Sequence, residues 1–166
     1  MAIKEVGRRE AQWQKPVFGV IKVNTDVAWC KKSLRMGVGW VCQDFSGLLQ
    51  AGGGSREGFC HSAVTAEANA IWDALVACIV NGFEKVTIES DAKVIIHMLR
   101  KELPSDFSLE CILGDIESLA RRLSLVTFTY VPRESNCVAY SVAKFVFKEG
   151  RAFVWDCISP DFCLTL

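Results

Sequence analysis

The sequence has no excess of charge of either sign. Its 19 lysine and arginine residues balance its 19 aspartate and glutamate residues, so the formal net charge is zero. A chain without net charge has no overall electrostatic field to attract nucleic acid or an anionic membrane surface. Any nucleic-acid contact must therefore rest on a local patch of basic side chains, and tight non-specific binding is not expected.

Histidine and paired cysteines are also scarce. There are two histidines, and the eight cysteines follow no Cys-x-x-Cys spacing: they are Cys30, Cys42, Cys60, Cys78, Cys111, Cys137, Cys157 and Cys163. A structural zinc site is therefore not expected. No secretory hydrophobic segment follows the charged start, so we expect free thiols in a reducing compartment, the nucleus or the cytoplasm.

Three further absences narrow the class of protein. No apolar run approaches membrane-spanning length, so no membrane partner is expected. Gly52 to Gly54 are not followed by Gly-Lys-Ser/Thr and a helix, which excludes a phosphate-binding loop and favours a strand end or bulge. No internal repeat or low-complexity segment is present. Because 51% of the residues are hydrophobic and the chain has 166 residues, we expect one globular domain, over 13–166. Residues 1–12 show no periodicity, and we expect them to form a flexible tail.

Hydrophobic periodicity predicts a mixed α/β domain. Val17 to Trp29 is β-branched and apolar on both parities, which is typical of a strand covered on two faces. Further strands are predicted over 35–43, 48–54, 84–90 and 125–131, and helices over 62–81, 93–100, 109–123 and 134–147. Residues 151–166 are expected to form an irregular tail. The first and fourth strands, separated by a helix, should be parallel neighbours in a five-stranded sheet.

Three acids converge in this arrangement. Asp26 lies late on the first strand, Asp91 directly follows the fourth, and Glu67 lies on the apolar stripe of the helix between them. Like charges resist ionisation together unless a cation neutralises them. Carboxylate oxygens with little histidine or cysteine nearby favour Mg²⁺ or Mn²⁺. Two such ions, about 3.5–4 Å apart, can activate water and stabilise the leaving oxygen in phosphodiester hydrolysis.

Each acid also has a structural interpretation. Asp91 could cap the following helix, Glu67 could reach the rim of the domain, and Asp26 could accept hydrogen bonds from backbone amides at the strand end. All three would have to hold together to remove the shared site.

The ordered motifs resemble the ribonuclease H-like domain of plants, related to the ribonuclease H portion of retroelement reverse transcriptases. The matching residues span about 13–166 and are Pro16, Gly19, Lys22, Val23 to Asp26, Ala28, Trp29, Gly37 to Gly39, Asp44, Gly47, Ala66 to Ala68, Ala70, Glu89 to Asp91, Val131 to Glu134 and Asn136. The resemblance implies a ribonuclease H-like fold with strand order 3-2-1-4-5. For active members it implies metal-dependent cleavage of the RNA strand of an RNA/DNA hybrid, with Asp26, Glu67 and Asp91 as the first three catalytic acids.

The chain departs from that family at the fourth acid. Active members carry an aspartate four residues after the asparagine matched by Asn136, whereas this chain has Tyr140. The family's loop histidine is replaced by Tyr130, and Val27 stands where glycine is usual. A phenol with a pKa near 10 is a poor ligand at neutral pH. Losing one carboxylate also relieves repulsion and weakens the need for a second ion.

Two functions follow from these observations. One is a metal-dependent endonuclease acting on RNA/DNA hybrid. The other is a binding or regulatory module that keeps the fold but not turnover, and contacts nucleic acid, a protein partner or a second copy of itself. Asn136, Arg133, Arg121 and Arg122 are candidate nucleic-acid contacts, and Lys144, Lys148 and Arg151 could extend a basic face. Ordinary solvated helix charges are the alternative interpretation of these basic residues. No aromatic-rich basic protrusion is evident between Asp91 and Leu125.

Overall fold

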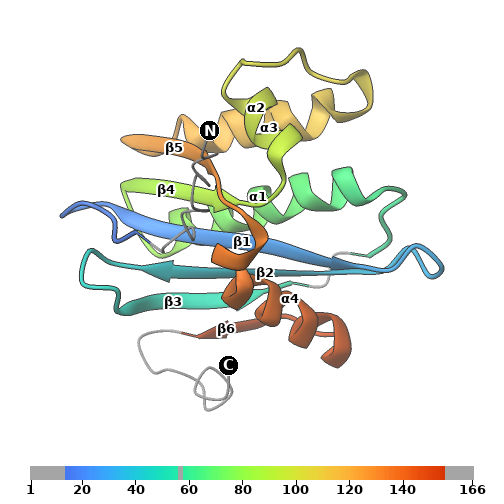
Figure 1. Ribbon diagram of the computed structural model, residues 1–166, viewed down its shortest axis with the longest axis horizontal. Coiled ribbons are helices and arrows are strands. Elements are labelled where there is room, and N and C mark those ends of the chain that lie inside the picture. The colour runs from blue at the N-terminus through green and yellow to red at the C-terminus, as the bar shows by residue number, and fades with distance from the viewer. Residues whose placement is uncertain (1–13, 56–57, 156–166) are drawn as a thin grey trace, which may run out of the picture.

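A computed structural model describes residues 14–55 and 58–155 (Figure 1). The strands are β1 (Ile21–Trp29), β2 (Met36–Gln43), β3 (Leu49–Gly54), β4 (Lys85–Ser90), β5 (Leu125–Tyr130) and β6 (Phe153–Trp155). The helices are α1 (Ala63–Val80), α2 (Lys93–Leu99), α3 (Glu110–Ala120) and α4 (Cys137–Glu149), with 3-10 turns η1 (Phe107–Leu109) and η2 (Arg133–Ser135). The predicted α/β class and order of elements are confirmed.

The sheet has the order β5-β4-β1-β2-β3-β6. β1 pairs in parallel with β4, and β4 with β5, whereas β2, β3 and β6 extend the sheet by antiparallel pairing. The predicted core order 3-2-1-4-5 is therefore confirmed, including the parallel pairing of the first and fourth strands. Because parallel strands end at the same edge, Asp26 and Asp91 are brought to one side of the sheet.

The prediction of five strands and an irregular segment from Arg151 is wrong for residues 153–155. Phe153–Trp155 form β6, an edge strand antiparallel to β3. Glycines in β3 permit this pairing, because a Cβ on Gly53 would lie 2.4 Å from the Phe153 carbonyl oxygen. Phe153 also packs on Phe145 of α4, with ring centroids 4.9 Å apart. The remainder of the predicted tail, 156–166, lies outside the described residues, as does the predicted flexible tail over 1–12.

The first strand begins later than its apolar pattern suggests. Val17 to Val20 form a turn in which the Val20 amide donates to the Val17 carbonyl at 3.1 Å, and Gly19 has a φ of +80°. That left-handed conformation suits glycine and ends extended backbone. The predicted strand over 17–29 is therefore shortened to Ile21–Trp29.

α1 lies at the centre of the larger core. By length and composition alone it could span a membrane, with a mean hydropathy of 1.5 over 18 residues, so the expectation that no apolar run approaches that length is wrong. Eight of its residues are buried, including Ile71 and Leu75, against the sheet and α3. Ser62 caps its first turn, and Gly82, with a φ of +72°, ends it as predicted. The apolar composition of α1 is that of a core helix.

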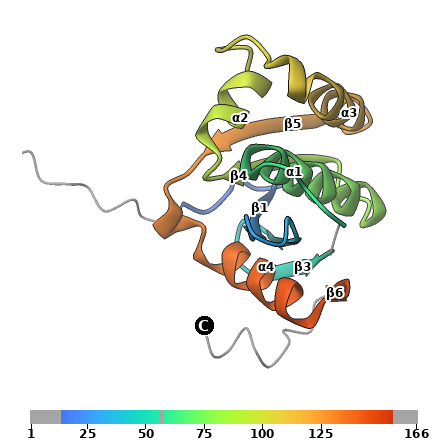
Figure 2. The same cartoon turned by 90° about the vertical axis from the view of Figure 1, so that its right-hand side faces the viewer.

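α4 covers the opposite face of the sheet (Figure 2). It packs directly on the backbone of β2, because a Cβ on Gly39 would lie 2.4 Å from the Ala143 amide nitrogen, and one on Gly37 would lie 2.6 Å from that of Phe147. Val142 and Val146 of α4 bury against Val41 in a second, smaller core. The two strand glycines therefore let α4 approach β1 and β2, which places its first turns beside the acids.

Candidate active site

Three acids meet at the carboxyl edge of the two central parallel strands. Asp26 comes from β1, Asp91 from the turn after β4, and Glu67 from the second turn of α1. One carboxylate oxygen from each lies within 4.8 Å of the other two. Asp26 is buried and the other two are partly buried. The predicted convergence of these three side chains is what the geometry shows.

Two oxygens of this cluster lack partners. Glu67 Oε2 and Asp91 Oδ1 are buried and accept no hydrogen bond from residues 14–55 or 58–155. Burying a carboxylate oxygen without a partner is costly unless a cation or a donor compensates. Three convergent carboxylates with orphaned oxygens are the ligand set that a hard divalent cation prefers. The residues therefore fit a Mg²⁺ or Mn²⁺ ion.

The electrostatics agree with an acid cluster that needs a counter-ion. Burial, followed by the neighbouring Asp91 carboxylate, raises the pKa of Asp26 to about 7. Burial, followed by the charges of Asp26 and Asp91, raises the pKa of Glu67 to about 8. Without a cation, the cluster therefore retains protons near neutral pH, as repelling acids in a poorly hydrated site do.

The structural interpretations of the three acids hold only in part. Asp91 does not cap α2, whose first turn has no side-chain cap and whose N-cap is Ala92. Asp26 does accept a backbone bond, from the Val27 amide to Oδ1 at 2.7 Å, and its Oδ2 accepts from Asn136 at 3.3 Å. Glu67 points into the domain and not to its rim. The three structural interpretations therefore do not account for the convergence of these side chains.

A buried polar network adjoins the cluster and was not predicted. Lys22 and Glu89 form an ion pair at 3.1 Å with side chains 5% and 10% exposed. The Asn24 amide donates to Glu89 at 3.0 Å and to the Asn136 carbonyl oxygen at 3.2 Å. Asn136 in turn donates to the Thr25 carbonyl at 2.9 Å as well as to Asp26. The polar alternation Lys22, Asn24, Asp26 along β1 is the sequence signal that could have revealed it.

The network changes the role expected of Asn136. Asn136 is 1% exposed, and its side chain forms hydrogen bonds with Asn24, Thr25 and Asp26 of β1, so it is not a surface contact for nucleic acid. It holds the beginning of α4 against β1 and orients Asp26 through Oδ2. Asn136 is therefore a positioning residue.

Tyr140 lies on the first turns of α4 and lines a groove of about 380 Å³ together with Glu67. Two cations stand against its ring: the Arg133 guanidinium is 5.9 Å and the Lys144 ammonium 5.6 Å from the centroid. Arg133 also approaches Asp91, with Nε 3.5 Å from Oδ2. At position 140, where the resemblance predicts a fourth acid, the structure therefore has a phenol with two basic side chains beside it.

The other residues singled out in the sequence, Tyr130, Arg121 and Arg122, do not lie together beside the acids. Tyr130 ends β5, and its ring lies 5.7 Å from the Lys93 ammonium. Arg121 and Arg122 precede β5, whose first residue pairs with Lys85 at the start of β4, whereas Asp91 follows the end of β4. They therefore lie at the opposite edge of the sheet, about 20 Å away by strand length. The two arginines do not join the acids, and the predicted basic face is divided.

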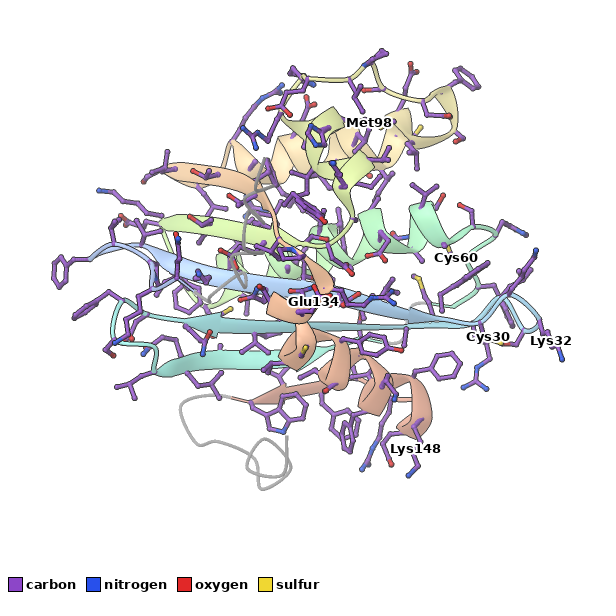
Figure 3. The ribbon with its side chains drawn as sticks, viewed as in Figure 1. Cys30, Lys32, Cys60, Met98, Glu134 and Lys148 are labelled. Carbon is purple, nitrogen blue, oxygen red and sulfur yellow. The ribbon has the colours of Figure 1, made fainter. Side chains whose placement is uncertain are left out.

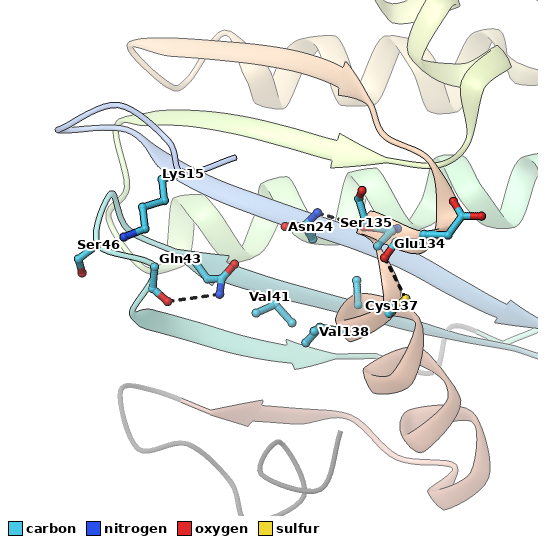
Figure 4. Close-up of a pocket in the computed structure, with 12 residues that line it drawn as sticks. Lys15, Asn24, Val41, Gln43, Ser46, Glu134, Ser135, Cys137 and Val138 are labelled. Atoms are coloured by element: carbon cyan, nitrogen blue, oxygen red, sulfur yellow. Dashed lines mark hydrogen bonds between the residues drawn. The ribbon is translucent and has the colours of Figure 1, made fainter. Parts of the chain in front are cut away.

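A second hollow, of about 510 Å³, lies beside the start of α4 (Figure 4). Asn24, Gln43, Ser135 and Cys137 are among its lining residues, and the Cys137 thiol bonds to the Glu134 carbonyl at 3.1 Å. None of the three acids lines it. The hollow is separate from the cluster, and Asn136 lies between them.

Comparisons with known proteins agree with this geometry. A "Putative ribonuclease H protein" of Arabidopsis thaliana is 27% identical over 149 residues, which are 90% of this chain; the chain spans only 24% of that relative. The crystal structure of RNase H1 from Halobacterium salinarum NRC-1 has a TM-score of 0.74 at 23% identity, covering 78% of this chain and 98% of that one. LC11-RNase H1 in complex with RNA/DNA hybrid has a TM-score of 0.71 at 19% identity, with coverages of 78% and 98%. The fold is therefore that of ribonuclease H.

The sequence itself matches a protein-family model. That family is described as reverse transcriptase-like, and the match covers residues 24–146. That span includes the three acids, the asparagine that positions Asp26, and Tyr140. The chain belongs to the reverse transcriptase-like family, whose members carry the ribonuclease H fold.

Proposed function

We propose that this protein is a metal-dependent ribonuclease H-type protein that engages the RNA strand of an RNA/DNA hybrid. The observation that carries the proposal is the convergence of one oxygen each from Asp26, Glu67 and Asp91 within 4.8 Å, with two further oxygens orphaned. Solved structures of the same fold support the choice of ligand, since one of them is a complex with RNA/DNA hybrid.

Asp26, Glu67 and Asp91 would hold the ion, which when bound supplies a Lewis acid for a phosphodiester oxygen and an acidified water. Asn136 keeps Asp26 in place through its bond to Oδ2. Arg133, beside Asp91 and 79% exposed, is placed to balance negative charge that a phosphate brings to the edge of the sheet.

We further propose that hydrolysis is slow in this chain because Tyr140 replaces a carboxylate ligand. A neutral phenol contributes no charge to a second ion, and the cations against its ring disfavour another one there. The ribonuclease H-type site would then hold one ion firmly and a second one weakly.

The test is cleavage of a labelled RNA/DNA hybrid with Mn²⁺ or Mg²⁺, comparing the native chain with Tyr140→Asp and Asp26→Asn. We expect slow, chelator-sensitive cleavage by the native chain, at least a tenfold gain for Tyr140→Asp, and loss for Asp26→Asn. Mn²⁺ titration of each variant, followed by calorimetry, reports the site without requiring activity. Failure of the native chain to bind Mn²⁺ would contradict the proposal.

A second candidate function, a binding module without turnover, is favoured by the cations held against Tyr140. It predicts that the native chain binds Mn²⁺ and hybrid but leaves the hybrid intact over many hours. In that case Tyr140→Asp separates a missing ligand from a distorted site, because only a missing ligand is repaired by the substitution.

A further inference from the structure

The groove beside α4 is more than an extension of the acid cluster. Along its length it is lined by Trp29 at the end of β1 and by Arg133, Tyr140, Lys144 and Phe147 along η2 and α4; we call this lining the α4 groove. Glu67 marks its inner end, where it meets the three acids. The groove therefore leads from the proposed metal centre to the end of the molecule where β1 ends.

This end of the molecule is locally basic although the whole chain is neutral. Lys31 and Lys32 are exposed in the turn after β1, and the Arg35 guanidinium lies 5.2 Å from the centroid of the Phe147 ring. Lys32 and Lys148 project toward the same end of the molecule in Figure 3. A cluster of cations around a concave surface creates a local field that the net charge conceals.

Tyr140 leaves the α4 groove positively charged. A carboxylate at this position would neutralise Arg133 or Lys144, whereas the phenol orients both cations without neutralising either one. Within the described part of the chain, Lys144 has no carboxylate within ion-pair distance. Loss of an acid at position 140 therefore creates an anion-binding surface next to the acids.

We propose that the α4 groove is a nucleic-acid subsite, in which Arg133 and Lys144 bind backbone phosphates of a strand whose neighbouring phosphate lies at the acid cluster. This inference rests on the proposed function and extends it to a second contact region. Cations interleaved with aromatic rings in a groove are the usual means of holding a nucleic-acid strand without reading its sequence. Each phosphate so neutralised adds to the salt dependence of binding.

The first measurement is binding in EDTA, which removes the contribution of a metal ion. A labelled RNA/DNA hybrid and a single-stranded RNA of equal length are titrated by fluorescence anisotropy over a series of salt concentrations. We expect Lys144→Gln to weaken binding several-fold and to lower the slope of log K against log salt by about one, as for one lost phosphate contact.

Two matched control variants test whether the change in salt dependence is specific to the α4 groove. Arg121→Gln and Arg122→Gln remove the same charge at the opposite edge of the sheet and should leave the slope unchanged. Arg133→Gln should resemble Lys144→Gln, but it also alters the surroundings of Asp91. Lys144→Gln is therefore the decisive variant, because Lys144 contacts the ring of Tyr140 and, within the described part of the chain, forms no ion pair with the three acids.

The second measurement uses a cysteine of the α4 groove as a reporter. Cys30 lines the groove, and hydrogen bonds from Ser33 lower the pKa of its thiol, which favours alkylation. Cys111 is exposed on α3 and away from the groove, so it is the internal control. With bound hybrid, peptide mass spectrometry should show alkylation of Cys30 slowed several-fold and that of Cys111 unchanged.

The outcomes are distinguishable. If the native chain binds hybrid but Lys144→Gln leaves the salt slope unchanged and Cys30 remains unprotected, the α4 groove is not the subsite, while the proposed function stands. If the native chain binds neither hybrid nor single-stranded RNA at low salt, either in EDTA or with Mn²⁺, both proposals fail. Protection of Cys30 together with a lower slope for Lys144→Gln supports the subsite directly.

Discussion

Two acidic sites lie next to each other where β1 pairs with β4, and their charges are balanced in different ways. Glu89 on β4 meets Lys22 at 3.1 Å and accepts a further bond from Asn24, so its charge is matched inside the fold. Asp26 lies two residues beyond Asn24 on β1, and Asp91 lies two residues beyond Glu89 in the turn after β4; both share an edge with Glu67. Among the described residues, the cation in ion-pair contact with these three acids is Arg133, whose Nε lies 3.5 Å from Asp91 Oδ2. Burial raises the pKa of two of these acids, Asp26 and Glu67, whereas Glu89 has its own cation beside it.

The difference separates a structural charge from a functional one. A buried ion pair that satisfies itself holds elements in register, and removal of either partner leaves an uncompensated charge. A buried carboxylate group with orphaned oxygens stabilises nothing by itself and indicates that a ligand from outside completes it. The ion pair of Lys22 and Glu89, together with Asn24 and Asn136, therefore positions the strands that carry the edge acids.

The largest effect should follow from opening the ion pair of Lys22 and Glu89. Lys22→Met leaves Glu89 buried without its cation, and we expect the free energy of unfolding to fall by about 3–5 kcal/mol, as for other broken buried pairs. Chemical denaturation followed by circular dichroism measures the change.

The matched control is the double variant Lys22→Met with Glu89→Leu, which replaces the pair by apolar side chains. It should recover at least half of the loss, because no unpaired charge remains. Equal destabilisation of the single and double variants would show that the unpaired charge of Glu89 is not the cause of the loss, and that the ion pair does not distinguish Glu89 from the edge acids.

A smaller effect should appear when the edge cluster titrates. The pKa of Asp26 rises from 3.8 to about 7 and that of Glu67 from 4.5 to about 8, so the folded chain binds protons more tightly than the unfolded chain. Below about pH 4 the acids are protonated in both states. As pH rises towards about pH 8 the stability contributed by these protons is lost.

The measurement is the free energy of unfolding in EDTA at about pH 5 and about pH 8, repeated with Mg²⁺. A bound ion should restore stability at the higher pH, by about 2.7 kcal/mol at a concentration one hundred times the dissociation constant. The double variant Asp26→Asn with Glu67→Gln should lack both the pH slope and the response to Mg²⁺. If the native protein in EDTA became more stable as pH rises to about 8, protonation of Asp26 and Glu67 would not be stabilising the folded chain.

The sequence predicts the edge cluster better than its support. Asp26, Glu67 and Asp91 are recognisable because each is an acid where an apolar or capping residue is expected, and parallel pairing of β1 with β4 brings them together. Lys22 and Asn24 are harder to recognise in the sequence, because Val23 and Val27 alternate with them and give the strand an apolar pattern. Their partners are distant in the chain: Glu89 is 65 positions from Asn24, and Asn136 is 112 positions from it.

Other differences arise from packing that no local pattern encodes. β6 has three residues, too few to display a period, and depends on glycines of β3 that allow close approach. The separation of Arg121 and Arg122 from Arg133 depends on the direction of β5, since the first two precede the strand and the third follows it. Basic residues adjacent in a list can therefore lie at opposite edges of a parallel sheet.

The smallest effect, and the one that links the two acidic sites, concerns Asn136. Its amide donates to the Thr25 carbonyl and to Asp26, and its carbonyl oxygen accepts from Asn24. Asn136→Ala removes these bonds, and we expect a loss of about 1–3 kcal/mol in the free energy of unfolding. Because Asp26 then loses the group that orients it, affinity for Mn²⁺ should fall by about tenfold.

Asn81→Ala is the matched control, since its amide bonds only to the Ala77 carbonyl at the end of α1, far from both acidic sites. It should lower stability slightly and leave Mn²⁺ affinity unchanged. If Asn136→Ala lost stability but bound Mn²⁺ as tightly as the native chain, Asn136 would hold α4 against β1 without orienting Asp26. The inner network would then be a support for the fold alone, and the edge cluster would be set by the turn after β4 and by α1, because Asp91 and Glu67 are the two acids that the network does not touch.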